Sequence, residues 1–136
     1  VLSEHLTLIT GLCQQAEKVA ELQPEIIRHR LLQQISDLLG SLPGLSEERL
    51  AQEAAVLMTK SDVREELDRL KTHISAAKDL MRTGGVIGRQ LDFLCQEFNR
   101  ETNTLCSKAA AAELSKIGLE LKAVIEQFRE QVQNIE

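Results

Sequence analysis

Two carboxylates in the last third of the chain, Glu97 and Glu101, are well placed to bind a cation. They lie four positions apart, so on a helix their like charges face each other at a small energetic cost. A divalent metal between them would remove that cost, and Mg²⁺ and Mn²⁺ prefer carboxylate, water and phosphate oxygens. With Asp92, they form a candidate metal site that could polarise a phosphodiester and help to generate hydroxide. Alternatively, Arg100 neutralises the pair or binds a phosphate with two N–H donors.

A second polar group precedes this one in the chain. Asp62, Glu66, Arg69 and His73 are separated by steps of four, three and four, which places them on one helix face. Glu66 and His73 are two turns apart, about 10 Å along the axis, so each would have to join groups from another helix to share an ion. His73 would then be a metal ligand or transfer a proton. The alternative is a solvated face whose ion pairs contribute only tenths of a kcal/mol.

Amide and basic side chains accompany the carboxylates. Asn99 and Asn103 could contact base edges or a ribose hydroxyl, or they could bridge backbone groups where helices pack. Arg89 and Lys108 bracket the segment. Together with Arg100, they are the best local candidates for phosphate contacts.

The elements that position these residues are predicted to be helices. Apolar residues recur at heptad-like spacing and no segment alternates with period two, which favours an all-α fold. We expect an elongated antiparallel bundle of long helices, arranged as hairpins with coiled-coil-like seams. The predicted helices span residues 1–22, 24–40, 46–82, 88–105 and 109–134. Pro24 either kinks one helix or begins a second, and Asp62, with Glu65 three residues later, could restart a helix inside 46–82.

The composition limits the possible functions. The chain has 136 residues, consistent with one domain, and 21 acidic against 16 basic residues give a net charge of −5. An acidic chain does not favour nucleic-acid binding, so any basic surface has to be a local patch or lie elsewhere. The three cysteines lack metal-type spacing and suggest reduced thiols in the cytoplasm. We expect no membrane span, no signal peptide and no nucleotide cofactor.

Three segments carry a resemblance to a known family. GRQLDFLCQEFNRETNTLCSK, from Gly88 to Lys108, resembles the signature near the C-terminus of the YicC/YloC family of bacterial endoribonucleases. SDVREELDRLKTH (61–73) and ELKAVIEQFREQVQNIE (120–136) resemble the same family, and the alanine run at 109–112 departs from its pattern. The resemblance implies a C-terminal helical domain without the family's N-terminal domain. It also implies RNA hydrolysis, Mn²⁺ or Mg²⁺ as cofactor, and a homo-oligomer.

These considerations assign three sets of residues. The candidate catalytic residues are Glu66, His73, Glu97, Arg100 and Glu101. The candidate metal ligands are His73, Asp92, Glu97 and Glu101. The candidate RNA-binding residues are Arg89, Asn99, Arg100, Asn103 and Lys108. The competing hypothesis is a non-catalytic assembly module, with catalysis in the missing N-terminal domain.

Overall fold

The protein is described by a computed structural model that covers residues 2–41, 47–60, 62–109 and 111–134. These residues form five helices: α1 (Leu2–Ser41), α2 (Glu47–Lys60), α3 (Arg64–Thr83), α4 (Gly88–Lys108) and α5 (Ala112–Asn134). The described ranges contain no strand. The structure therefore confirms the all-α fold.

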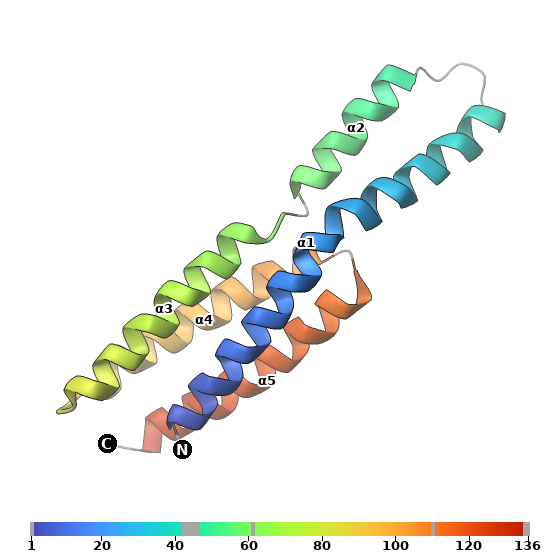
Figure 1. Cartoon of the computed structure of the whole chain (residues 1–136). Coiled ribbons are helices and arrows are strands. Elements are labelled where there is room, and N and C mark those ends of the chain that lie inside the picture. Colours follow the sequence, from blue (N-terminus) through green and yellow to red (C-terminus); the bar gives the residue numbers. More distant parts are fainter. Residues whose placement is uncertain (1, 42–46, 61, 110, 135–136) are drawn as a thin grey trace.

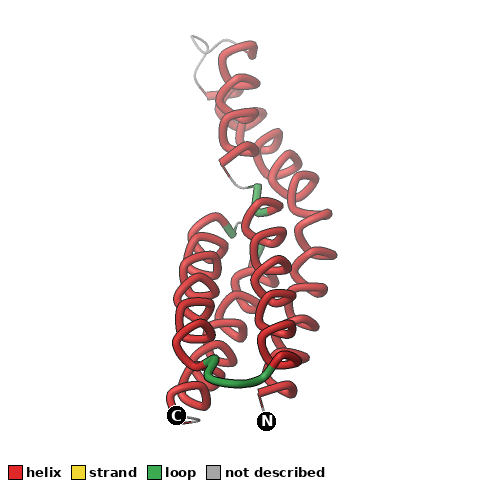
Figure 2. Tube along the Cα trace, turned by 90° about the vertical axis from the view of Figure 1, so that its left-hand side faces the viewer, coloured by secondary structure: helices red, strands yellow, loops and turns green. Residues whose placement is uncertain are grey.

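Four of the helices pack into an antiparallel bundle (Figure 1). α1 contacts α3 and α5, and α4 contacts the same two helices. This places α1 diagonally opposite α4. The C-terminal half of α1 continues beyond the bundle, where α2 runs back along it as a hairpin, and a quarter turn shows the same elongated shape (Figure 2).

The core follows the apolar stripes seen in the sequence. Residues three and four positions apart share a helix face, and each bundle helix turns its stripe inward; Leu6, Leu70, Leu91 and Leu121 are all buried. Burial of each such side chain contributes about 1.5–3 kcal/mol. The polar residues that border the stripes of α3 and α4 consequently meet at the interface between these two helices.

α1 passes through Pro24 without ending. The predicted division into helices 1–22 and 24–40 is therefore wrong, and the alternative of one helix that contains the proline is confirmed. Proline in a helix interior removes a backbone hydrogen bond and costs about 3 kcal/mol. The apolar residues Ala16, Val19, Ala20 and Ile27 lie buried or half-buried on either side of it, and their packing offsets this cost.

The predicted helix 46–82 is two helices, because α2 ends at Lys60 and α3 begins at Arg64. Asp62 lies in the break, where its Oδ1 accepts a hydrogen bond of 2.9 Å from the backbone N–H of Arg64. Asp62 thus satisfies one of the free N–H groups at the start of α3. The alternative of a restart at this residue is confirmed.

The other helices begin or end within a few residues of their predicted ends. α4 extends three residues beyond the predicted end at Leu105, and α5 begins at Ala112 instead of residue 109. The predicted first residues Val1 and Ser46 lie outside the described ranges. No helix in the described part of the chain combines the length and apolar character needed to cross a membrane.

Candidate metal centre

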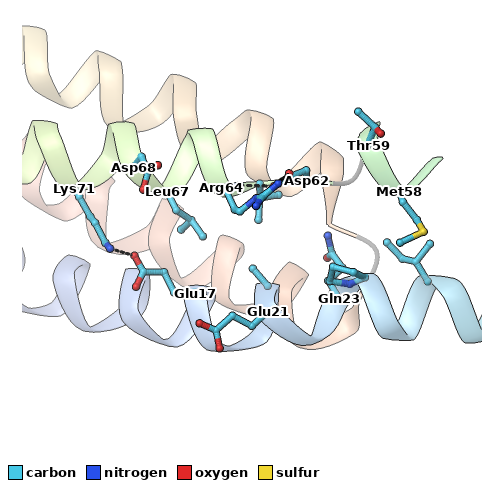
Figure 3. A pocket seen from close by; sticks show the side chains of 14 residues that line it. Glu17, Glu21, Gln23, Met58, Thr59, Asp62, Arg64, Leu67, Asp68 and Lys71 are labelled. Atoms are coloured by element: carbon cyan, nitrogen blue, oxygen red, sulfur yellow. Dashed lines mark hydrogen bonds and ion pairs between the residues drawn. The ribbon is translucent and has the colours of Figure 1, made fainter. Parts of the chain in front are cut away.

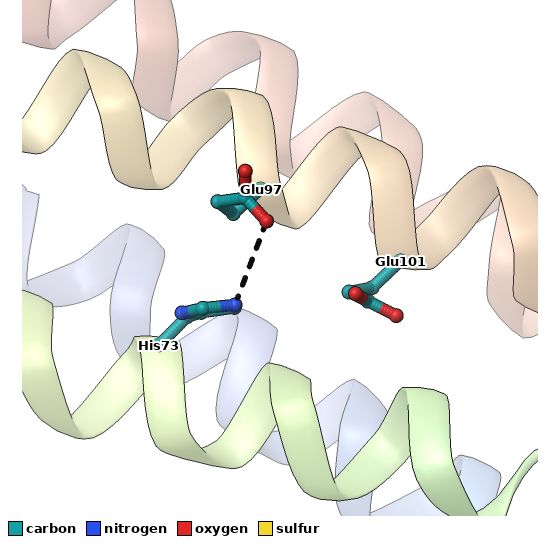
Figure 4. Close-up of side chains that lie close together, drawn as sticks. All are labelled: His73, Glu97 and Glu101. Carbon is teal, nitrogen blue, oxygen red and sulfur yellow. Dashed lines mark ion pairs between the residues drawn. The ribbon is translucent and has the colours of Figure 1, made fainter.

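Three of the predicted site residues converge between α3 and α4. One ligand atom each from His73, Glu97 and Glu101 lies within 4.8 Å of the others. His73 Nε2 faces Glu97 Oε2 at 3.9 Å across the helix interface (Figure 4). One imidazole nitrogen and two carboxylate oxygens form a donor set that suits first-row divalent metals, because imidazole and carboxylate are both common ligands of these ions.

The core holds these donors in place. The ring of His73 packs edge-on against the ring of Phe98, with centroids 6.4 Å apart, and Phe98 is fully buried. Phe98 also packs against Phe128 of α5, at 6.1 Å. Because Glu97 directly precedes Phe98 on α4, the packing that orients His73 also fixes the backbone of Glu97.

The three donors differ in exposure. The side chains of His73 and Glu97 are 22% and 23% exposed, whereas Glu101 is buried. The group therefore has an open rim at His73 and Glu97 and a closed base at Glu101. The side chains of the rim are therefore partly in contact with solvent.

Arg69 contacts the base of this group. Its Nε donates a hydrogen bond of 2.8 Å to Glu101 Oε1, and its terminal nitrogens lie 3.6 Å from carboxylate oxygens of Glu65 and Glu66. The pKa of Arg69 is raised, chiefly by the hydrogen bond to Glu101. The sequence interpretation placed Arg69 on the same face as His73 but did not assign it to the site. The four-residue spacing to His73 was the available indication.

Glu66 and Lys108 form a separate, internal ion pair. Glu66 is only 1% exposed, and its Oε1 accepts a hydrogen bond of 2.7 Å from Lys108 Nζ. Lys108 also donates to the backbone oxygen of Asp62 at 3.3 Å. These contacts contradict the expectation that Glu66 reaches a substrate and that Lys108 is free to contact RNA. A lysine three residues past the predicted helix end is drawn inward because a buried carboxylate requires a counter-charge.

Asp92 lies apart from the His73 group, so the structure does not bring it together with the other predicted ligands. Its Oδ1 lies 4.0 Å from Arg129 Nε of α5, and its Oδ2 accepts a hydrogen bond from Gln96 at 3.4 Å. Five residues separate Asp92 from Glu97, a rotation of roughly 140° about the helix axis. The two carboxylates therefore face different neighbouring helices.

The other predicted residues lie along the outer side of α4. Arg89, Arg100 and Asn103 are exposed, and Asn99 is half-buried. Arg100 follows Glu97 by three positions, so it neighbours the rim of the group on the helix surface. The structure brings none of these four into the His73 group.

A hollow of about 630 Å³ lies elsewhere, between α1 and the junction of α2 with α3. Four of its charged side chains form ion pairs, Lys71 with Glu17 and Arg64 with Asp62, and Glu21 and Asp68 also line it (Figure 3). The hydrogen bonds from Arg64 lower the pKa of Asp62. Both basic side chains of the hollow are engaged in these ion pairs, and we assign it no chemistry.

The buried cysteines are poor nucleophiles. Burial raises the pKa of Cys13 and of Cys95 to about 12. Only a thiolate attacks or binds metal efficiently, so both residues serve as apolar packing. This agrees with their interpretation as packing thiols.

Comparison with known proteins identifies the family. Residues 16–136 match the family model described as "Endoribonuclease YicC-like, C-terminal". The chain is 42% identical over 125 residues to a "Probable endoribonuclease YicC" of Haemophilus influenzae, covering 90% of this chain and 42% of that protein. A protein of the same name from Clostridioides difficile is 40% identical over 129 residues, covering 95% of this chain and 44% of the relative. The chain thus spans less than half the length of these relatives, and it belongs to the YicC-like endoribonuclease family as a C-terminal domain.

Proposed function

We propose that this chain is the RNA-binding and catalytic helical domain of a metal-dependent endoribonuclease. One observation carries the proposal: His73, Glu97 and Glu101 converge from two helices, with ligand atoms within 4.8 Å of one another. We infer that these three residues hold a divalent cation. The imidazole in the set favours Mn²⁺ over Mg²⁺, which prefers oxygen ligands alone.

The cation, when bound, would polarise the phosphodiester and lower the pKa of a water molecule. The protein supplies the remaining functions. Arg69 holds the carboxylate of Glu101 through its hydrogen bond. Arg100, exposed on the turn after Glu97, offers paired N–H donors to a phosphate, and Asn103 offers an amide to the ribose or base one turn further along.

RNA as substrate is supported by the names of the two relatives, which describe probable endoribonucleases. The three cysteines are unpaired, as is usual in a reducing compartment. We therefore propose a cytoplasmic enzyme acting on RNA, in keeping with these observations.

The decisive experiment measures cleavage of labelled RNA by the 136-residue chain with Mn²⁺, with Mg²⁺ and with EDTA. Glu97→Gln and His73→Ala are expected to abolish metal-stimulated cleavage. Glu126→Gln, an exposed carboxylate of α5, is the matched control and should cleave normally. Circular dichroism checks that each variant is folded. Undiminished cleavage by the folded Glu97→Gln and His73→Ala variants would overturn the proposal.

A second function, assembly of several chains, is supported by apolar side chains on the α1–α2 hairpin. Leu22, Leu32, Val56 and Leu57 are all exposed there, and helices pack through such residues. We propose that these surfaces join copies into a homo-oligomer. Light scattering measures the molar mass of the assembly that the chain forms in solution. The Haemophilus influenzae relative is a longer protein that can be tested in the same cleavage assay. A discrete oligomer that cleaves no RNA, beside an active longer relative, would favour assembly as the sole function of the domain.

A further inference from the structure

The outer face of α4 carries a regular row of exposed side chains. Arg89, Phe93, Gln96, Arg100 and Asn103 follow one another in steps of four, three, four and three, so they share one helix face. All five are exposed, and Phe93 is 59% exposed. A phenylalanine left in water between two arginines is not explained by the packing of the bundle.

The charge of this row differs from that of the whole chain. The chain has a net charge of −5, but the row contains two arginines and no carboxylate. Within the described residues, neither Arg89 nor Arg100 forms an ion pair, whereas Arg64, Arg69 and Arg82 all do. The two guanidinium groups are therefore available to an external anion.

We propose that this row binds an unpaired RNA segment, with a base stacked on the ring of Phe93 and phosphates on Arg89 and Arg100. The proposal rests on the proposed function, which supplies RNA as the ligand. Arg89 and Arg100 lie about 16 Å apart along the helix, with Phe93 between them, so a strand can contact both charges and the ring together. Base–aromatic stacking requires an unpaired base and tolerates any sequence.

The row also borders the candidate metal centre. Phe93 precedes Glu97 by four positions and Arg100 follows it by three, so both neighbour the exposed rim of the His73 group. A strand held along the row would pass beside that rim. The row thus selects unpaired RNA and presents its backbone for cleavage.

A second copy of the chain fits the row less well. A two-fold contact through the same face pairs each patch with itself. Arg89 and Arg100 of one copy would then approach those of the other, and their like charges would oppose the contact. A polyanion meets no such opposition.

The test measures the affinity of the 136-residue chain for fluorescein-labelled poly(U), and for an RNA duplex, by fluorescence anisotropy in EDTA. Phe93→Ala is expected to weaken poly(U) binding about tenfold and to leave duplex binding unchanged. Phe93→Trp should restore poly(U) binding, since it restores a stacking surface. The matched control is Leu8→Ala, because Leu8 is 53% exposed on α1, diagonally opposite α4.

Two results would overturn the inference. Equal affinity of wild type and Phe93→Ala for poly(U) would exclude stacking, and a change in oligomer mass in Phe93→Ala would show that the row contacts protein instead. The assay contains no metal, so it is independent of cleavage. If the chain cleaves RNA normally but Phe93→Ala binds poly(U) as tightly as the wild type, only this inference is refuted. If poly(U) binding depends on Phe93 but metal does not stimulate cleavage, only the proposed catalytic function is refuted.

Discussion

Two acidic sites lie on the same pair of helices, and they have opposite characters. Around Glu66, a single carboxylate is buried and receives a hydrogen bond from Lys108. Two turns further along α3, His73 faces two carboxylates, Glu97 and Glu101, of which Glu97 is partly exposed. The first site is internally balanced, whereas the second has more negative charge than its neighbours neutralise.

The comparison shows how charge balance separates a structural site from a binding site. A buried carboxylate is costly unless a cation pairs with it, and Lys108 provides that cation for Glu66 through Oε1, although Glu66 Oε2 accepts no hydrogen bond from the described residues. At the His73 site, Arg69 forms an ion pair with Glu101, but it also pairs with Glu65 and Glu66. One guanidinium cannot neutralise all three carboxylates. An added cation would therefore be stabilised at the second site and not at the first.

The largest expected effect concerns the buried Glu66–Lys108 pair, called here the closed site. Lys108→Met leaves Glu66 buried without its main counter-charge, and it should lower the free energy of unfolding by about 3 kcal/mol. Urea denaturation followed by circular dichroism measures the change. The double variant Glu66→Gln/Lys108→Met removes both charges and should recover most of the loss. A single variant as stable as the wild type would show that solvent, not Lys108, balances Glu66.

The next effect concerns the group of His73, Glu97 and Glu101, called here the open site. Mn²⁺ at about one hundred times its Kd should raise the free energy of unfolding by about 2.7 kcal/mol. Glu97→Gln should abolish this increase, because it removes a ligand from the rim. Glu66→Gln/Lys108→Met should keep it, because those residues are not ligands. Thermal and urea denaturation with and without Mn²⁺ make the comparison; an equal response of all three proteins would mean that the ion binds elsewhere.

Arg69 joins the two sites, and its removal sharpens the contrast. Its guanidinium competes with a bound cation for Glu101 Oε1, to which it donates a hydrogen bond of 2.8 Å. Arg69→Gln should therefore tighten Mn²⁺ binding about fivefold, through loss of a nearby positive charge. Isothermal titration calorimetry measures the Kd. Weaker binding would mean instead that Arg69 mainly orients Glu101 for the ion.

The smallest effect is a pH dependence at Asp62, beside the closed site. Hydrogen bonds from Arg64 lower the pKa of the Asp62 carboxyl. The stability that this carboxylate contributes is therefore fully present above the pKa of an aspartate in the unfolded chain, about 3.9. It is lost as the pH falls through the lowered pKa of the folded protein. Asp62→Asn should cost about 0.3 kcal/mol at neutral pH, since the pair is exposed to solvent. The difference from wild type should vanish in acid. A constant difference in urea titrations across this range would show that the charge of Asp62 contributes nothing.

The local spacing of residues in the sequence was sufficient to predict the helices and part of the candidate site. Period-3.6 apolar patterns predicted the bundle, and the four-residue step from Glu97 to Glu101 placed both carboxylates on one side of a helix. The same spacing could not distinguish Lys108 from Arg100. Both looked like exposed cations, yet only Lys108 lies opposite the buried Glu66.

By itself, the sequence determined which faces of each helix are apolar and which residues are neighbours along one helix, because both follow from the 3.6-residue turn. Only the tertiary structure decided that His73 meets Glu97 and Glu101, that Asp92 turns toward Arg129, and that Lys108 is drawn inward. These pairings join residues on different helices. They depend on the rotation and register with which α3, α4 and α5 pack, and the core side chains set those quantities collectively.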